Sequence, residues 1–227
     1  MKQATLEKLQ VAARDGQCRL FYFDEAGFCG SPPVQRSWSP RGLPHAIEPN
    51  HHCRRNVMGA LNFAENSFVH AATSHTVKGP HVEGFLNDLI CHGDGRPTVI
   101  VLDNASIHYG IDQVTLDRWF IEHKALLFYL PPYSPELNLI EIVWKHFKYH
   151  WRRFATWTKE TIDAELEILL NGYGSKFQVK FFVNTYYLSK LTTVYLQCEY
   201  QHVMNSQGLN GQKIGAMINN TSVVRHT

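Results

Sequence analysis

Three acidic residues in this 227-residue sequence have the types and surroundings of a metal-dependent site for phosphoryl transfer. Asp24 and Asp103 each directly follow a short, continuous apolar run, which is typical of a strand buried on both faces of a mainly parallel sheet. Glu141 lies among apolar residues spaced three or four apart, as on a helix that packs against such a sheet. Catalytic groups gather at the carboxyl ends of parallel strands, so we expect the three carboxylates to converge at one edge.

Converging carboxylates would suit two divalent cations. Cleavage of a phosphodiester needs a deprotonated water or hydroxyl for attack and stabilisation of the leaving oxygen, and two ions roughly 3.5–4 Å apart can supply both. Mg²⁺ prefers oxygen ligands and takes only one or two carboxylates, so three acids suffice for two ions. Without metal, the clustered carboxylates would repel one another. Taken singly, each acid could instead be a solvated surface charge or the start of a turn.

Hydrophobic patterning predicts the elements that would position these acids. We expect one strand that ends at Asp103 and further strands at about residues 18–24, 34–38, 54–63, 67–74 and 126–130. We expect helices at about residues 79–91, 112–124 and 158–171. A further helix should carry Glu141 and begin with Ser134 as its N-cap, followed by Pro135. Apart from an extra hairpin strand, this order predicts an α/β, ribonuclease H-like fold, with a mixed five-stranded sheet flanked by helices.

Three motifs around the acids resemble those of the Tc/mariner-like transposases, specifically the bacterial insertion-sequence branch. Phe21–Phe28 and the following Arg36–Gly42 are similar to that family's first strand, first Asp and Trp-x-x-x-Gly segment. Val101–His108 is similar to its Asp-Asn-x-x-x-His element. Leu130–Lys145 is close to its Pro-Pro-Tyr-Ser-Pro-x-x-Asn-x-Ile-Glu-x-x-Trp signature, the most specific of the three. Leu139 departs from the pattern, since Pro is common at that position.

The resemblance spans about residues 17–180 and implies a function. Asp24, Asp103 and Glu141 would be the catalytic acids and the ligands of Mg²⁺, or of Mn²⁺ as its substitute, with two ions bound. The protein would cleave DNA at the inverted repeats of its own element and join the ends to target DNA at TA sites, acting as a homo-oligomer. The family's helix-turn-helix region, which reads the repeats, has no counterpart in the sequence, so we expect it to be encoded upstream.

Further residues are candidates for contact with DNA. They are Trp38, Asn104, His108, Lys145, Lys148, Arg152 and Arg153. Asn104 and His108 could instead cap a turn and bind the backbone, and the basic residues could form a solvated helix face. Most tryptophans fall on core-facing positions, and Trp38 is the exception.

Composition bounds the remaining questions. With 44% hydrophobic residues the chain can bury a substantial core, and we divide it into a helical remnant or linker at 1–17, a catalytic domain at 18–180 and an atypical, partly disordered tail at 181–227. No apolar run has the length of a membrane span, and the five scattered cysteines match no zinc pattern, so we expect free thiols. We expect a cytoplasmic protein acting on bacterial nucleoid DNA.

Two other functions remain open from the sequence. One is a structure-selective nuclease of the same fold, which the Pro-Pro-Tyr-Ser-Pro string disfavours. The other is an inactive, transposase-derived protein that binds DNA and regulates an intact transposase. The presence of all three acids disfavours this last alternative without excluding it.

Overall fold

The computed structural model describes residues 2–30, 40–43, 53–151 and 158–181, and residues up to Lys180 form one compact unit. The expected strand at 34–38 and nearly all of the expected C-terminal tail lie outside the described residues. Within the described part of the chain, no helix is long and apolar enough to cross a membrane.

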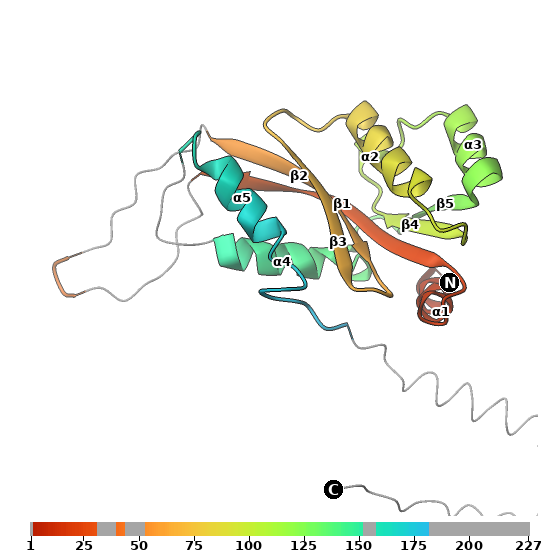
Figure 1. Ribbon diagram of the computed structural model, residues 1–227, viewed down its shortest axis with the longest axis horizontal. Helices are drawn as coiled ribbons and strands as arrows, with labels where there is room; N and C mark the ends of the chain where they lie inside the picture. Colours follow the sequence, from red (N-terminus) through yellow and green to blue (C-terminus); the bar gives the residue numbers. More distant parts are fainter. Residues whose placement is uncertain (1, 31–39, 44–52, 152–157, 182–227) are drawn as a thin grey trace, which may run out of the picture. The chain divides into compact units, whose positions relative to one another are not determined.

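A five-stranded mixed sheet forms the centre of the structure, in the order β3-β2-β1-β4-β5 (Figure 1). β1 (Arg19–Cys29), β2 (Arg54–Asn62) and β3 (Ser67–Thr73) are antiparallel neighbours. β4 (Thr98–Leu102) pairs in parallel with β1, and β5 (Ala125–Tyr129) pairs in parallel with β4. The predicted mixed five-stranded sheet is confirmed.

Helices cover the sheet on both sides. They are α1 (Lys2–Arg14), α2 (Gly79–Cys91), α3 (Gln113–His123), α4 (Ile140–Trp151) and α5 (Ile162–Leu170). α2 and α3 share a core cluster with alternate residues of β1 and β4, including Phe21, Phe23 and Ile100. α4 packs on the opposite face of β1, where the ring of Phe28 meets the ring of Trp144 edge-on. Because side chains alternate across a strand, the same two strands serve both layers.

Close packing fixes α4 against the sheet. The Trp144 side chain is buried, and a Cβ atom placed on Gly59 of β2 would lie 2.7 Å from its ring. Only glycine therefore leaves room for the indole at this point. Trp119 and Trp151 are also buried, as predicted for packing residues, whereas Trp38 lies outside the described residues.

Two expected boundaries differ from the structure. Asp24 does not end its strand, because β1 continues to Cys29 by pairing with β2 as far as Arg54. Nor does the helix of Glu141 begin at Pro135. Pro135–Leu137 form a separate 3₁₀ turn, η2, and α4 starts at Ile140, because the extended backbone of Asn138 interrupts the helical path between them.

Candidate active site

Asp24 and Asp103 lie on neighbouring parallel strands. The parallel pairing of β1 and β4 ends at Tyr22 opposite Val101, and each acid follows two positions later. Since side chains two apart in a strand share a face, Asp24 lies on the side of the sheet that α4 covers, and Asp103 directly follows the end of β4. Asp24 is thus at the carboxyl end of the parallel pairing although it is inside its strand.

Glu141 enters the same neighbourhood from the first turn of α4. The pKa of Asp24 is raised to about 7, first by burial and then by the charges of Glu25, Glu141 and Asp103, despite a hydrogen bond from the backbone of Glu25. The three predicted acids therefore act electrostatically on one another. At neutral pH, the Asp24 carboxyl is divided between its protonated and ionised forms in the metal-free protein.

A buried histidine links the second acid to a fourth carboxylate. The His108 side chain has no exposed surface; its Nδ1 lies 2.8 Å from Asp103 Oδ1 and its Nε2 lies 3.1 Å from Glu25 Oε1. Burial alone would lower the pKa of His108, but its bonds to Asp103 and Glu25 raise that pKa to about 10. The same contact lowers the pKa of Asp103. His108 is thus an imidazolium that fixes the Asp103 carboxylate.

Glu25 is a site residue that the sequence analysis overlooked. The sequence signal was its position directly after Asp24. Neighbouring strand residues point to opposite faces, so Glu25 points away from the side of the sheet that α4 covers. The pairing with His108, 83 positions away, could not be seen in the sequence.

Asn138 joins the Asp24 strand to the Glu141 helix. Its Nδ2 donates a hydrogen bond of 3.2 Å to the carbonyl of Phe23, the residue before Asp24. Its own carbonyl accepts from the Glu141 backbone N–H at 3.0 Å. The amide oxygen of this buried side chain has no hydrogen-bond partner, although buried polar atoms are normally paired. The sequence analysis gave this residue no role.

The donor set fits a hard divalent cation. Mutually repelling carboxylates and an unpaired buried amide oxygen are oxygen ligands of the kind Mg²⁺ and Mn²⁺ prefer. Among the described residues, no group of three or more His, Cys, Asp or Glu side chains is arranged to hold one ion. Mg²⁺ sites with one or two carboxylates, completed by water and phosphate oxygens, do not need such a group.

The other predicted contacts with DNA have different surroundings. Asn104, next to Asp103, accepts a hydrogen bond from the hydroxyl of Tyr109. Lys145 and Lys148 are exposed and line a hollow of 290 Å³ together with Glu141. This places two basic side chains beside the third acid. Arg152 and Arg153 lie outside the described residues.

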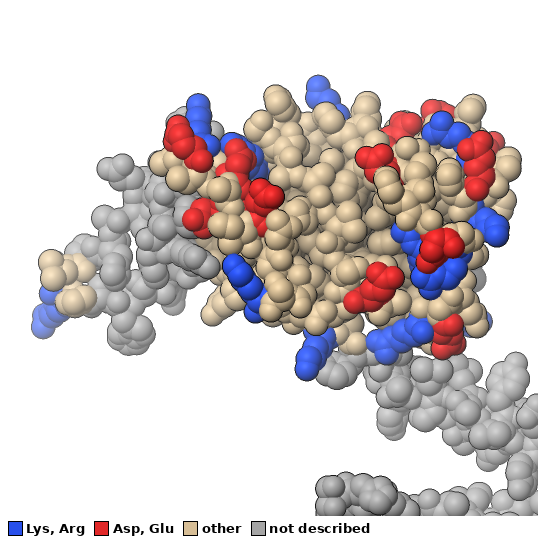
Figure 2. Space-filling view, viewed as in Figure 1, with Lys and Arg blue, Asp and Glu red and all other residues tan. Residues whose placement is uncertain are grey.

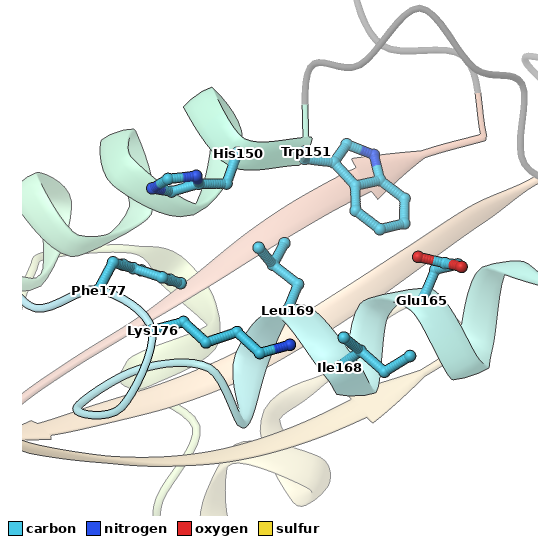
Figure 3. Close-up of a pocket in the computed structure, with 7 residues that line it drawn as sticks. All are labelled: His150, Trp151, Glu165, Ile168, Leu169, Lys176 and Phe177. Carbon is cyan, nitrogen blue, oxygen red and sulfur yellow. The ribbon is translucent and has the colours of Figure 1, made fainter.

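A pocket of 190 Å³ lies at the opposite end of α4 (Figure 3). His150 and Trp151, in the last turn of α4, face Leu169 of α5. Glu165 is the one carboxylate among the residues drawn there. A single carboxylate does not make a site for two ions. The carboxylate cluster at the start of α4 is therefore the better candidate for the active site.

The chain matches proteins of known family and structure. The family model of the DDE superfamily endonucleases matches residues 19–162, which is more than half of the chain. The search of curated proteins found no match. Three solved structures of Mos1 are similar: a strand transfer complex (15% identity, TM-score 0.55, covering 75% of this chain and 52% of that one), a transposase paired-end complex with the left transposon end (14%, 0.54, 75% and 53%) and a mariner paired-end complex with Mg (14%, 0.52, 74% and 53%).

These likenesses establish the fold as that of the Mos1 transposase structures, which confirms the predicted ribonuclease H-like architecture. The chain spans about half the length of the solved structures it matches. The family model thus shows the DDE superfamily endonucleases, and the solved transposase structures show a similar fold. This chain contains the endonuclease domain of an enzyme and belongs to the DDE superfamily endonucleases.

Proposed function

We propose that this protein is the catalytic part of a DNA transposase, which cleaves the ends of its element and transfers the freed strands to target DNA at TA sites. One observation carries the proposal: Asp24, Asp103 and Glu141 come from three different elements and lie close enough to shift the pKa of Asp24. Such a convergence of acids is unfavourable without a cation, because the neighbouring negative charges disfavour the charged form of Asp24.

Asp24, Asp103 and Glu141 would hold two Mg²⁺ ions, with Mn²⁺ as a substitute. When bound, the ions would activate the attacking oxygen and stabilise the leaving oxygen. The protein's own contribution is to position the ligands. Glu25 and His108 hold the Asp103 carboxylate in place, and Asn138 fixes the spacing between Asp24 and the first turn of α4.

The partner in this proposal is DNA, both the inverted repeats of the element and the target. Lys145 and Lys148 beside Glu141 would contact phosphates near the reacting bond. Asn104 would orient the loop after Asp103. We also propose residues 18–180 as the catalytic domain, a homo-oligomer on bacterial nucleoid DNA, and a helix-turn-helix region encoded upstream as the reader of the repeats.

A metal titration of the full chain tests the proposal. We expect Mn²⁺ and Mg²⁺, in the millimolar range expected of a weak site, to raise the Tm of the wild type but not that of Asp103→Asn. The matched control is Asp163→Asn, since Asp163 pairs with Arg55 at 2.7 Å, away from the cluster. That variant should respond to metal as the wild type does.

The outcome decides whether the acids form an ion site. If neither metal stabilises the wild type even with DNA present, the proposed ligand set is wrong. If the wild type responds, nicking of element-end DNA in the presence of a helix-turn-helix region that reads the repeats becomes the direct test of activity.

A further inference from the structure

Tyr133 has a backbone conformation and an exposure that its own chain does not explain. Its φ is +57°, in the left-handed region that costs most residues free energy and that favours glycine or asparagine. Its side chain is fully exposed, with a relative accessibility of 101%. A large aromatic ring that is this exposed cannot offset backbone strain, and strain of this kind concentrates at functional sites.

The loop around Tyr133 is anchored beside two of the acids. At its start, the Leu130 N–H donates to the carbonyl of Leu102, the residue before Asp103, at 2.9 Å. At its end, the Leu137 N–H donates to the Ser134 carbonyl at 3.1 Å and leads into the turn before Glu141. Tyr133 therefore lies on the segment that connects the second acid's strand to the third acid's helix.

The loop is also stiff. Pro131, Pro132 and Pro135 restrict the backbone on both sides of the tyrosine. The Ser134 hydroxyl donates to the Pro132 carbonyl at 3.3 Å and closes the turn. A ring held outward by a rigid loop loses little conformational entropy when it binds a partner, so its position favours recognition.

A second aromatic residue lies on the loop after Asp103. Tyr109 is 57% exposed, and its ring stacks on Tyr129 with centroids 5.1 Å apart and planes 6° apart. The Tyr129 hydroxyl donates to the His108 carbonyl at 3.0 Å, so the stack is tied to the site. Exposed aromatic side chains thus occur on the loops that follow both β4 and β5.

We propose that Tyr133 stacks on an unpaired DNA base next to the reacting phosphate. This inference rests on the proposed function and specifies the state of its DNA substrate. Uncharged, exposed rings beside an acidic centre suit the apolar face of a nucleobase rather than a phosphate, and bases stack on aromatic side chains only where they are free of the double helix. Tyr109 would offer a second ring for a neighbouring base.

The test measures binding of the full chain to two DNA probes, a fully paired duplex and the same duplex with a short unpaired overhang that carries 2-aminopurine. We expect Tyr133→Ala to weaken binding to the overhang probe by about 5- to 150-fold, the range of one base–aromatic stack. The affinity of Tyr133→Ala for the paired duplex should stay within about twofold of the wild-type affinity, the size of effect usual for a substitution at an exposed site. The 2-aminopurine fluorescence should respond to the wild type and not to Tyr133→Ala.

Two variants serve as controls. Tyr133→Phe keeps the ring and should restore wild-type binding. Phe120→Ala removes a ring that is 61% exposed on α3 and should change neither probe. Because the Tyr133 side chain is fully exposed, Tyr133→Ala should keep the wild-type Tm and its response to Mn²⁺.

The proposal is overturned if Tyr133→Ala binds both probes as the wild type does, or if it weakens both probes equally. It also fails if the wild type binds neither probe while Mn²⁺ still raises its Tm. That last result would leave the metal-site proposal standing, so the failures of the two proposals can be distinguished.

Discussion

The pKa values of Asp24 and His108 are both raised within one site, with opposite effects on their charge. The pKa of the Asp24 carboxyl is raised to about 7, which disfavours its charged form. The pKa of His108, which lies between Asp103 and Glu25, is raised to about 10, which favours its charged form. The site thus holds a cation, His108, beside an acid whose ionisation at neutral pH a second cation would favour. We infer that the metal-free site is stabilised at low pH and strained at high pH.

We expect Asp24→Asn to raise the Tm of the metal-free protein at pH 8. The folded pKa of Asp24, about 7, lies above its ordinary value of 3.8, so the folded state binds more protons than the unfolded state between these values. Stability therefore falls as the pH rises from about 4 to about 7, by on the order of a few kcal/mol at most, and stays low above it. The amide cannot ionise and removes this cost.

Thermal unfolding of both proteins from pH 4 to 9 with a chelator present measures the effect. The difference in Tm between Asp24→Asn and the wild type should be smallest below pH 4, grow from there to about pH 7 and stay constant above it. The contribution of His108 is fully present below about pH 6.5 and falls as the pH rises from there to about 10, but both proteins carry His108, so the difference between their curves reports Asp24. Parallel curves for the two proteins would contradict the assignment of a buried, raised Asp24.

At the scale of the elements, α4 is fastened to β1 at both ends. Asn138, just before the helix, donates to the Phe23 carbonyl at 3.2 Å. Trp151, in the last turn, donates through Nε1 to the Cys29 carbonyl at 2.9 Å. Only the first of these bonds lies beside the carboxylates. The helix therefore offers two similar attachments, of which one positions the site and the other serves stability alone.

We expect Asn138→Leu and Trp151→Phe each to destabilise the fold by about 1 kcal/mol, the usual net contribution of one hydrogen bond. Only Asn138→Leu should weaken Mn²⁺ binding. It removes the hydrogen bond that holds the start of α4, and with it Glu141, at a fixed distance from Asp24, and it also removes the unpaired amide oxygen. Denaturant unfolding gives the first quantity, and the shift of Tm with Mn²⁺ concentration gives the second. Equal metal responses in the two variants would assign Asn138 a purely structural role.

At the scale of the molecule, the charge is nearly balanced at +2, and placement matters more than total. On the face seen in Figure 2, basic and acidic side chains are interspersed toward both ends and the middle is largely uncharged. The basic pair Lys145 and Lys148 lies on α4 beside Glu141. With so few basic side chains beside the site, binding to DNA would be weak. Contacts to phosphates would position the DNA at the site and give little sequence preference.

Replacing Lys145 and Lys148 together by Ala should therefore reduce the salt dependence of DNA binding. Each lost phosphate contact lowers the slope of log K against log salt by about 0.9, so the pair should lower it by up to about 2. Fluorescence anisotropy with duplex DNA at several salt concentrations measures this slope. The control pair Lys8→Ala and Lys159→Ala lies elsewhere on the exposed surface and should leave the slope unchanged.

The sequence by itself determined the elements and the identity of the acids. Apolar runs and periodicity depend on neighbours in the chain, so the helix at 79–91 and the strand before Asp103 matched the structure closely. The motifs around Asp24, Asp103 and Glu141 likewise sufficed to predict an enzyme that cleaves DNA, in agreement with the DDE superfamily endonuclease family that the chain matches.

Only the tertiary structure decided what depends on distant partners. β1 runs past Asp24 because β2 is there to pair with it, and α4 begins late because Asn138 binds a strand residue 115 positions away. The salt link of His108 to Glu25, and with it the charge of the site, exists only once β1 and the loop after β4 are packed together. These features follow from spatial contacts between segments far apart in the chain, which local patterns of polarity and spacing do not encode.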